Sequence, residues 1–169
     1  ANFRMLSVAP SGEYFNFADC GDREGSNGDI VLAWFAQKTG NPLYLQKERF
    51  LIPAESMGNL SRLAGPGLVW LSQFKSKGGT TLPLVWKGEG SNPLVIFRGG
   101  EDDPRKYYFG GKGGKANLSH GNMDAGSFVF ELDGVRWAVD PGVQDYNTLE
   151  QAGFDLWGQF QDCQRWPLL

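Results

Sequence analysis

A tight hairpin in the second half of the chain constrains the fold more than any other feature of the sequence. Residues 127–140 read SFVFEL-DG-VRWAVD, two β-rich runs that are separated by Asp133-Gly134. Asp-Gly between alternating apolar residues is the strongest short-range hairpin signal, because both residues accept the positive φ of a two-residue turn. We therefore predict an antiparallel hairpin of 127–132 with 135–140.

A two-residue turn also sets the register of the two strands. Counting outward from the turn predicts the pairs Leu132–Val135, Glu131–Arg136, Phe130–Trp137, Val129–Ala138, Phe128–Val139 and Ser127–Asp140. Because successive side chains alternate between faces, the large apolar residues share one face, which we predict to be the core side. That face comprises Phe128, Phe130, Leu132, Val135, Trp137 and Val139. The opposite face carries Ser127, Glu131, Arg136 and Asp140, with Glu131 and Arg136 as a cross-strand ion pair.

Helical periodicity in the first part of the chain gives way to strand periodicity in the second. Residues 3–17 indicate a short hairpin or an extended arm, and helices are expected between about 27 and 76, with a stop at Gly40 and a new start at Asn41-Pro42. Further strand-like runs lie at 92–100 and 105–111. Helices followed by a sheet favour an α+β fold, with a helical segment over 1–77 and an antiparallel sheet over 78–169.

Composition and charge exclude several classes of protein. The net charge of −3 gives no basic footprint for nucleic acid or anionic lipid. No apolar run approaches the roughly 20 residues of a membrane span. The chain begins at Ala1 without a methionine and ends at QRWPLL without a polar tail, so we expect a fragment of a larger protein whose sheet is truncated at the C-terminus. Cys20 and Cys163 fit either one disulfide or two unpaired thiols.

The only histidine, His120, lies in a polar loop directly before the hairpin, together with Asn122 and Asp124. Asp140 lies at the open end of the hairpin, opposite that loop. The predicted geometry therefore gathers two carboxylates, an amide and an imidazole at one end of a sheet. This pattern fits either a functional site or a solvated hairpin end, since Asp140-Pro141-Gly142 is also good turn chemistry.

A glycine- and lysine-rich stretch, GGKGGK at residues 110–115, is similar to a phosphate-binding loop. However, Ala116 stands where that motif requires Ser or Thr. The interpretation that we favour is a flexible, positively charged loop beside a site for a polyanion. Lys112 and Lys115 are then candidate substrate-binding residues.

The stretch KYYFGGKGGKANLSHGNMDAGSFVFELDGVRWAVDPG, residues 106–142, resembles the heparinase II/III-like polysaccharide lyases. In that family a glycine-rich approach leads to His-x-His-x-Asp, then Gly-Ser-Phe, a hairpin and Asp-x-Gly. The resemblance implies the end of an α/α toroid followed by an antiparallel β-sandwich portion. It also implies a periplasmic or secreted enzyme that cleaves an acidic polysaccharide, such as heparan sulfate or alginate, by β-elimination at a uronate.

The same resemblance assigns roles to individual residues. His120 matches the catalytic histidine of the sheet, whereas the acid–base tyrosine of the family lies on the toroid, outside this chain, so the isolated fragment should be inactive. Some members hold a structural zinc through the second histidine of His-x-His and the aspartate of Asp-x-Gly. Here Asn122 replaces that histidine and Asp140 matches the aspartate, a set that suits calcium better than zinc, or no metal.

A different class of function stays open beside the lyase. The chain could be a non-catalytic carbohydrate-binding module or a structural β-sandwich module. Exposed Trp or Tyr side chains beside the Asp140 end of the hairpin would favour this alternative.

Overall fold

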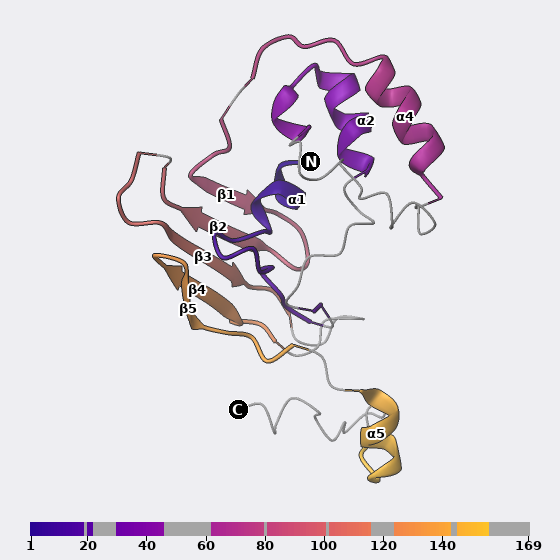
Figure 1. Ribbon diagram of the computed structural model, residues 1–169. Helices are drawn as coiled ribbons and strands as arrows, with labels where there is room; N and C mark the ends of the chain where they lie inside the picture. The colour runs from indigo at the N-terminus through magenta and orange to yellow at the C-terminus, as the bar shows by residue number, and fades with distance from the viewer. Residues whose placement is uncertain are drawn as a thin grey trace. The chain divides into compact units, whose positions relative to one another are not determined.

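A computed structural model describes residues 1–18, 20–21, 30–45, 62–79, 81–100, 102–115, 124–142 and 145–155. The chain divides into two compact units, Ala1–Met5 with Gly25–Pro83, and Leu6–Glu24 with Leu84–Leu169. Helices and an antiparallel sheet in one chain confirm the α+β fold (Figure 1). The division falls after Pro83, where the sequence predicts one after residue 77, and the sheet unit also includes the segment that begins at Leu6.

The first unit is built from short helices around a small apolar core. Its elements are α2 (Ile30–Thr39), the 3-10 turn η2 (Pro42–Tyr44) and α4 (Ala64–Ser72), and α1 (Asn2–Leu6) begins in this unit. Met5, Leu32, Ala36 and Tyr44 form the buried core. In the part of the chain that the structure describes, no helix is long and apolar enough to cross a membrane.

The predicted helix stop and start between α2 and η2 are confirmed. Gly40 has a φ of 76°, and its amide donates to the carbonyl of Ala36 (2.7 Å), which closes the last turn of α2. The Asn41 side chain accepts a hydrogen bond from Leu43 N (3.0 Å), so it caps the turn that begins at Pro42. Residue 27, near which the sequence predicts the first helix to begin, lies outside the described residues.

The second unit contains a five-stranded antiparallel sheet. Its strands are β1 (Val85–Gly88), β2 (Leu94–Arg98), β3 (Tyr107–Lys112), β4 (Phe128–Leu132) and β5 (Val135–Ala138), in the order β1-β2-β3-β4-β5 (Figure 1). Each strand pairs with its neighbour in sequence, so the sheet is a simple meander. The sequence analysis did not identify β1, or the helix α5 (Tyr146–Gln151), which is capped by the Asp145 side chain.

The predicted hairpin is present, but its register is only partly as predicted. Asp133 and Gly134 have φ values of 53° and 79°, as the two-residue turn requires. Leu132 pairs with Val135 and Glu131 pairs with Arg136, as predicted, but Phe130 then pairs with Ala138. Trp137 is therefore an extra residue on β5, a β-bulge, and the predicted pair of Phe130 with Trp137 is wrong. A bulge shifts every later pair by one residue, which the turn alone cannot reveal.

The predicted core face of the hairpin is also wrong, because the more polar face is the buried one. Val129 and Glu131 are both 0% exposed, and Ile96 and Tyr108 on the same side of the sheet are also buried. On the face predicted to be the core, several large apolar side chains are substantially exposed: Phe128 at 48%, Val135 at 53%, Trp137 at 70% and Val139 at 64%. Hydrophobicity alone therefore did not decide which face is covered.

The N-terminal arm, residues 7–18, explains this reversal. The arm doubles back on itself through a bridge of Val8 with Tyr14, which agrees with the predicted hairpin or extended arm from residue 7 onward. The same prediction is wrong for residues 3–6, which belong to the helix α1. Phe15, 2% exposed, lies directly over Gly110 of β3, where a Cβ would be 2.6 Å from the Phe15 ring. The Tyr108 hydroxyl donates to the carbonyl of Leu6 (2.8 Å), just before the arm. The arm thus covers the polar face of the hairpin and supplies partners for its charges.

Candidate functional site

The candidate site lies at the open end of the hairpin and is built around two carboxylates. We call Asp124 and Asp140, with the three side chains that bind them or their backbone, the carboxylate cluster; the three are Asn16, Lys112 and Ser127. The residues of the cluster come from the arm, from the end of β3, and from the segments that precede β4 and follow β5. The sequence prediction that Asp124 and Asp140 belong to one end of the sheet is consistent with these contacts.

Asp124 is held by an ion pair and by the arm. The Lys112 ammonium pairs with Asp124 Oδ1, and the two side chains are 3% and 15% exposed. The other oxygen, Oδ2, accepts a hydrogen bond from the backbone N–H of Ala18 (2.9 Å). The Lys112 ammonium also lies 5.7 Å from the centre of the Phe17 ring, within the range of a cation–π contact. Both charges of the pair are therefore largely removed from water, and each is neutralised by the other.

Asp140 is held on both carboxylate oxygens and on its backbone. Oδ1 accepts from the N–H of Gly142 (2.8 Å), which closes an Asx turn over Pro141. Oδ2 is hydrogen-bonded by the hydroxyl of Ser127. The backbone carbonyl accepts from the Asn16 side chain (2.9 Å). The turn chemistry predicted for Asp140-Pro141-Gly142 is therefore present, and the same turn restrains the Asp140 carboxylate.

The backbone around Lys112 and Asp124 closes the base of the segment between them. Lys112 N donates to the carbonyl of Ser127 (2.9 Å), and Gly126 N donates to the carbonyl of Lys112 (2.7 Å). Ser127 N donates to the carbonyl of Asp124 (2.9 Å). These bonds hold Lys112 next to the turn that begins at Asp124. His120 and Asn122 themselves lie outside the described residues.

The two candidate lysines differ sharply in their surroundings. Lys112 is buried, paired with Asp124 and part of β3. The strand agrees with the predicted run at 105–111, whereas the flexible loop that we predicted for residues 110–115 is wrong for Gly110 to Lys112. This placement favours an anchoring role for Lys112 over direct contact with a substrate. Lys115 is exposed beyond the end of β3.

The described residues supply few metal ligands. No group of three His, Cys, Asp or Glu side chains among them is close enough to hold a metal ion. Of the two predicted ligands only Asp140 is described, and each of its oxygens already accepts a hydrogen bond. One carboxylate is fewer donors than a zinc or calcium site requires, so the remaining ligands would have to come from residues outside the described part.

Tyr108 in β3 does not have the surroundings of an acid–base group. Tyr108 is 2% exposed, and burial raises the pKa of its phenol well above the ordinary value. Its hydroxyl donates to a backbone carbonyl, which keeps the proton in place. Tyr108 is therefore a packing residue of the sheet and the arm.

The predicted cross-strand ion pair is present, and it is buried rather than solvated. Arg136 Nε donates to Glu131 Oε1 (2.8 Å), and the side chains are 6% and 0% exposed. The arm completes the network: Ser11 binds the Glu131 carboxylate through its hydroxyl (2.6 Å) and its amide (3.1 Å). Arg136 also lies 3.1 Å from the Glu13 carboxylate. The arm therefore satisfies charges that the sequence alone placed in water.

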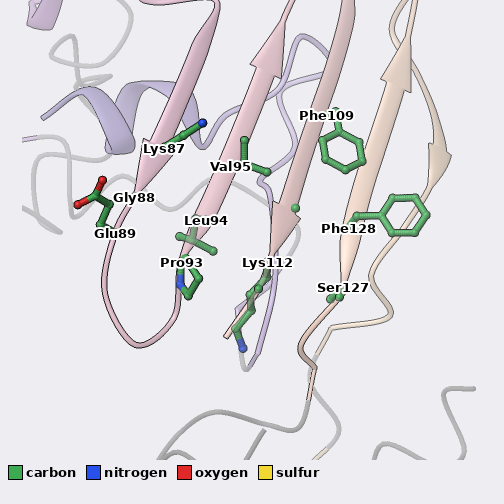
Figure 2. A pocket seen from close by; sticks show the side chains of 13 residues that line it. Lys87, Gly88, Glu89, Pro93, Leu94, Val95, Phe109, Lys112, Ser127 and Phe128 are labelled. Carbon is green, nitrogen blue, oxygen red and sulfur yellow. The ribbon is translucent and has the colours of Figure 1, made fainter. Parts of the chain in front are cut away.

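The sheet has a groove on its aromatic face, which the sequence analysis did not predict. The groove has a volume of about 460 Å³, and Lys87, Val95, Phe109 and Phe128 are among its lining residues. Figure 2 shows the rings of Phe109 and Phe128 on the neighbouring strands β3 and β4. Their centres are 5.8 Å apart, and Phe97 lies 5.9 Å from Phe109 on the other side.

Comparison with known proteins adds no family assignment to this geometry. No protein-family model matches the chain. No curated protein matches it either.

Proposed function

We propose that this chain contributes the sheet side of the active site of a polysaccharide lyase that cleaves uronate-containing polysaccharides by β-elimination. One observation carries the proposal: two restrained carboxylates belong to one cluster at the open end of the hairpin, and one of them, Asp124, directly follows the segment that contains His120. The resemblance of residues 106–142 to the heparinase II/III-like lyases supplies the reaction. We also propose, from the same resemblance, that the helices are the end of an α/α toroid, that the sheet is part of a β-sandwich, and that the enzyme is periplasmic or secreted.

The proposed reaction breaks the C5–H and C4–O bonds of the uronate and forms a C4–C5 double bond. A base takes the C5 proton, and an acid protonates the departing glycosidic oxygen. Negative charge builds up on the uronate carboxylate in between, so a preorganised positive group facing it lowers the barrier. His120 is our candidate for that group, because it matches the catalytic sheet histidine of the lyases that residues 106–142 resemble and an imidazole can carry a positive charge near neutral pH.

Two lysines have proposed roles beside His120, one in the charge of the cluster and one in binding the polymer. Lys112 neutralises Asp124, so the cluster presents less negative charge to an acidic polysaccharide than its two aspartates suggest. Lys115, exposed beyond β3, is the candidate for contact with the polymer outside the reacting sugar. The acid that protonates the leaving oxygen is provided by a residue outside this chain.

The test is product formation by the intact protein that contains this chain. Heparan sulfate and alginate should yield the ultraviolet absorbance of an unsaturated uronate, while a neutral polysaccharide gives none. The isolated chain of 169 residues should give no turnover, because it holds only part of the required groups. Absence of activity on every uronate polymer by the intact protein would refute the proposal.

A second candidate, a non-catalytic carbohydrate-binding module, is favoured by one specific observation. Trp137, close to Asp140 along the hairpin, is 70% exposed, and exposed indole rings provide stacking surfaces for sugars. If this function is the correct one, Trp137→Ala should weaken polysaccharide binding at least tenfold, while His120→Ala leaves it unchanged. If the protein is a lyase, His120→Ala should lower turnover more than Trp137→Ala does. The two variants therefore distinguish the two functions.

A further inference from the structure

The arm contacts the β4–β5 hairpin at both of its ends. Near the turn, the Ser11 amide and hydroxyl bind the carboxylate of Glu131 at 3.1 and 2.6 Å. The Arg136 guanidinium donates to the carbonyl of Tyr14 (2.7 Å). These contacts join charged side chains that are almost fully buried, so a slip of the arm by one residue would leave buried charges without partners. The register of the arm on the sheet is therefore strongly specified.

At the open end of the hairpin the same arm binds the carboxylate cluster. The Asn16 amide donates to the backbone carbonyl of Asp140 (2.9 Å), and Ala18 N donates to the carboxylate of Asp124 (2.9 Å). Asn16 is 2% exposed. Phe15 and Phe17 flank it on the arm, the first packed on Gly110 and the second beneath Lys112. The arm thus transfers its fixed register to both carboxylates.

The side chain of Asn16 is an unfavourable choice for stability alone. Its Oδ1 atom is buried and accepts no hydrogen bond from any residue in the described part of the chain. A buried acceptor without a partner is destabilising, whereas an apolar residue of similar size would avoid that cost. The benefit of asparagine here must therefore lie in the bond that its amide nitrogen makes to Asp140.

We propose that Asn16 is a positioning residue for Asp140. Its amide fixes the Asp140–Gly142 turn against the arm, and the turn in turn holds the Asp140 carboxylate through Gly142 N–H. The inference rests on the proposed function for its last step, that the position of Asp140 matters for the reaction. The contact itself stands independently of any activity.

The first test measures the turn directly, in the chain of 169 residues, by hydrogen exchange of individual amides. Asn16→Leu keeps the approximate volume and removes the donor, and Asn16→Asp keeps the shape and removes it. In both variants the Gly142 amide should exchange about tenfold faster relative to the amides of β2 and β3, the effect of one lost hydrogen bond. Val129→Ala, a buried change with no polar contact to the cluster, should speed exchange without singling out Gly142. Unchanged relative protection of Gly142 in Asn16→Leu would overturn the proposal.

The second test measures turnover in the intact protein. Asn16→Leu should lower kcat about tenfold or more with little change in KM, since a small displacement of an active-site group is sufficient for such a loss. Val129→Ala should keep kcat per folded molecule. Loss of Gly142 protection with unchanged kcat would also overturn the positioning role. If the unmodified protein shows no lyase activity, the proposed function fails, and the exchange experiment still decides whether Asn16 fixes the Asp140 turn.

Discussion

The packing of the arm on the sheet can be tested at one glycine. Gly110 lies in β3 under the ring of Phe15, and a Cβ added there would be 2.6–2.8 Å from three ring carbons. No real Cβ contact is that short, so Gly110→Ala must displace either the ring or the strand. Phe15 is 2% exposed and lies in contact distance of the Phe17 ring (centres 5.0 Å apart), which leaves it little room to move.

The expected cost follows from these contacts. Overpacking a well-filled core costs about 1–3 kcal/mol. Replacing glycine in a strand recovers roughly 0.5–1 kcal/mol of backbone entropy. The net loss should therefore be about 1–2 kcal/mol, which lowers the urea midpoint of the sheet unit by about 0.5–1 M for a typical slope of about 2 kcal/mol per M.

Urea unfolding of the variants provides the assay and its controls. Gly100→Ala is the matched control, because the nearest atom to its Cβ, Leu84 Cδ2, is 3.9 Å away. It should stay within about 0.5 kcal/mol of the parent. Phe15→Leu should relieve the clash, so that the double variant with Gly110→Ala is less destabilised than the sum of the two single variants. If Gly110→Ala unfolds at the same midpoint as Gly100→Ala, the arm does not cover this face of the sheet.

Two further predictions concern buried groups under the arm. Among the described residues, Glu131→Gln leaves the buried Arg136 guanidinium with the partly exposed Glu13 as its one charged partner, so this variant should lose about 3 kcal/mol of unfolding free energy in urea. The control Glu89→Gln, on the exposed β1–β2 loop, should lose almost nothing. Equal losses in the two variants would contradict the buried ion pair. Burial raises the pKa of Tyr108 in the folded chain, so this group contributes stability that is present below its unfolded pKa near 10 and is lost as the pH rises above it. Tyr108→Phe should therefore cost about 1 kcal/mol at pH 7 through its lost hydrogen bond, and the gap should narrow between pH 9 and 11; a gap that widens with pH would contradict the assigned burial.

Local sequence signals predicted the elements of this fold better than the way in which they pack. Asp133-Gly134 and Gly40 identified a turn and a helix end, because both depend on backbone conformations that only neighbouring residues determine. The buried face of the hairpin depends instead on the arm, which is more than 100 residues away in the sequence from Glu131. Since Ser11 and Arg136 satisfy the Glu131 carboxylate, the charged face can be buried and Phe128 can remain exposed.

The candidate site shows the same division. The alternation of residues in the hairpin brought Asp140 and the loop containing Asp124 to one end of the sheet, and both aspartates belong to the carboxylate cluster. Asn16 could not be predicted, because nothing in its own neighbourhood in the sequence marks it as a partner of Asp140. The bulge at Trp137 was missed for a related reason: an extra residue on one strand leaves no pattern in the alternation around it.

The substitution His120→Ala in the intact protein tests the central claim most directly, with turnover on a uronate polysaccharide and the melting temperature measured on the same preparation. Loss of a group that stabilises charge in the transition state should reduce kcat by a factor of about 10² or more, while the melting temperature barely changes. A lower melting temperature with unchanged turnover per folded molecule would show that His120 is structural, and would contradict the catalytic assignment.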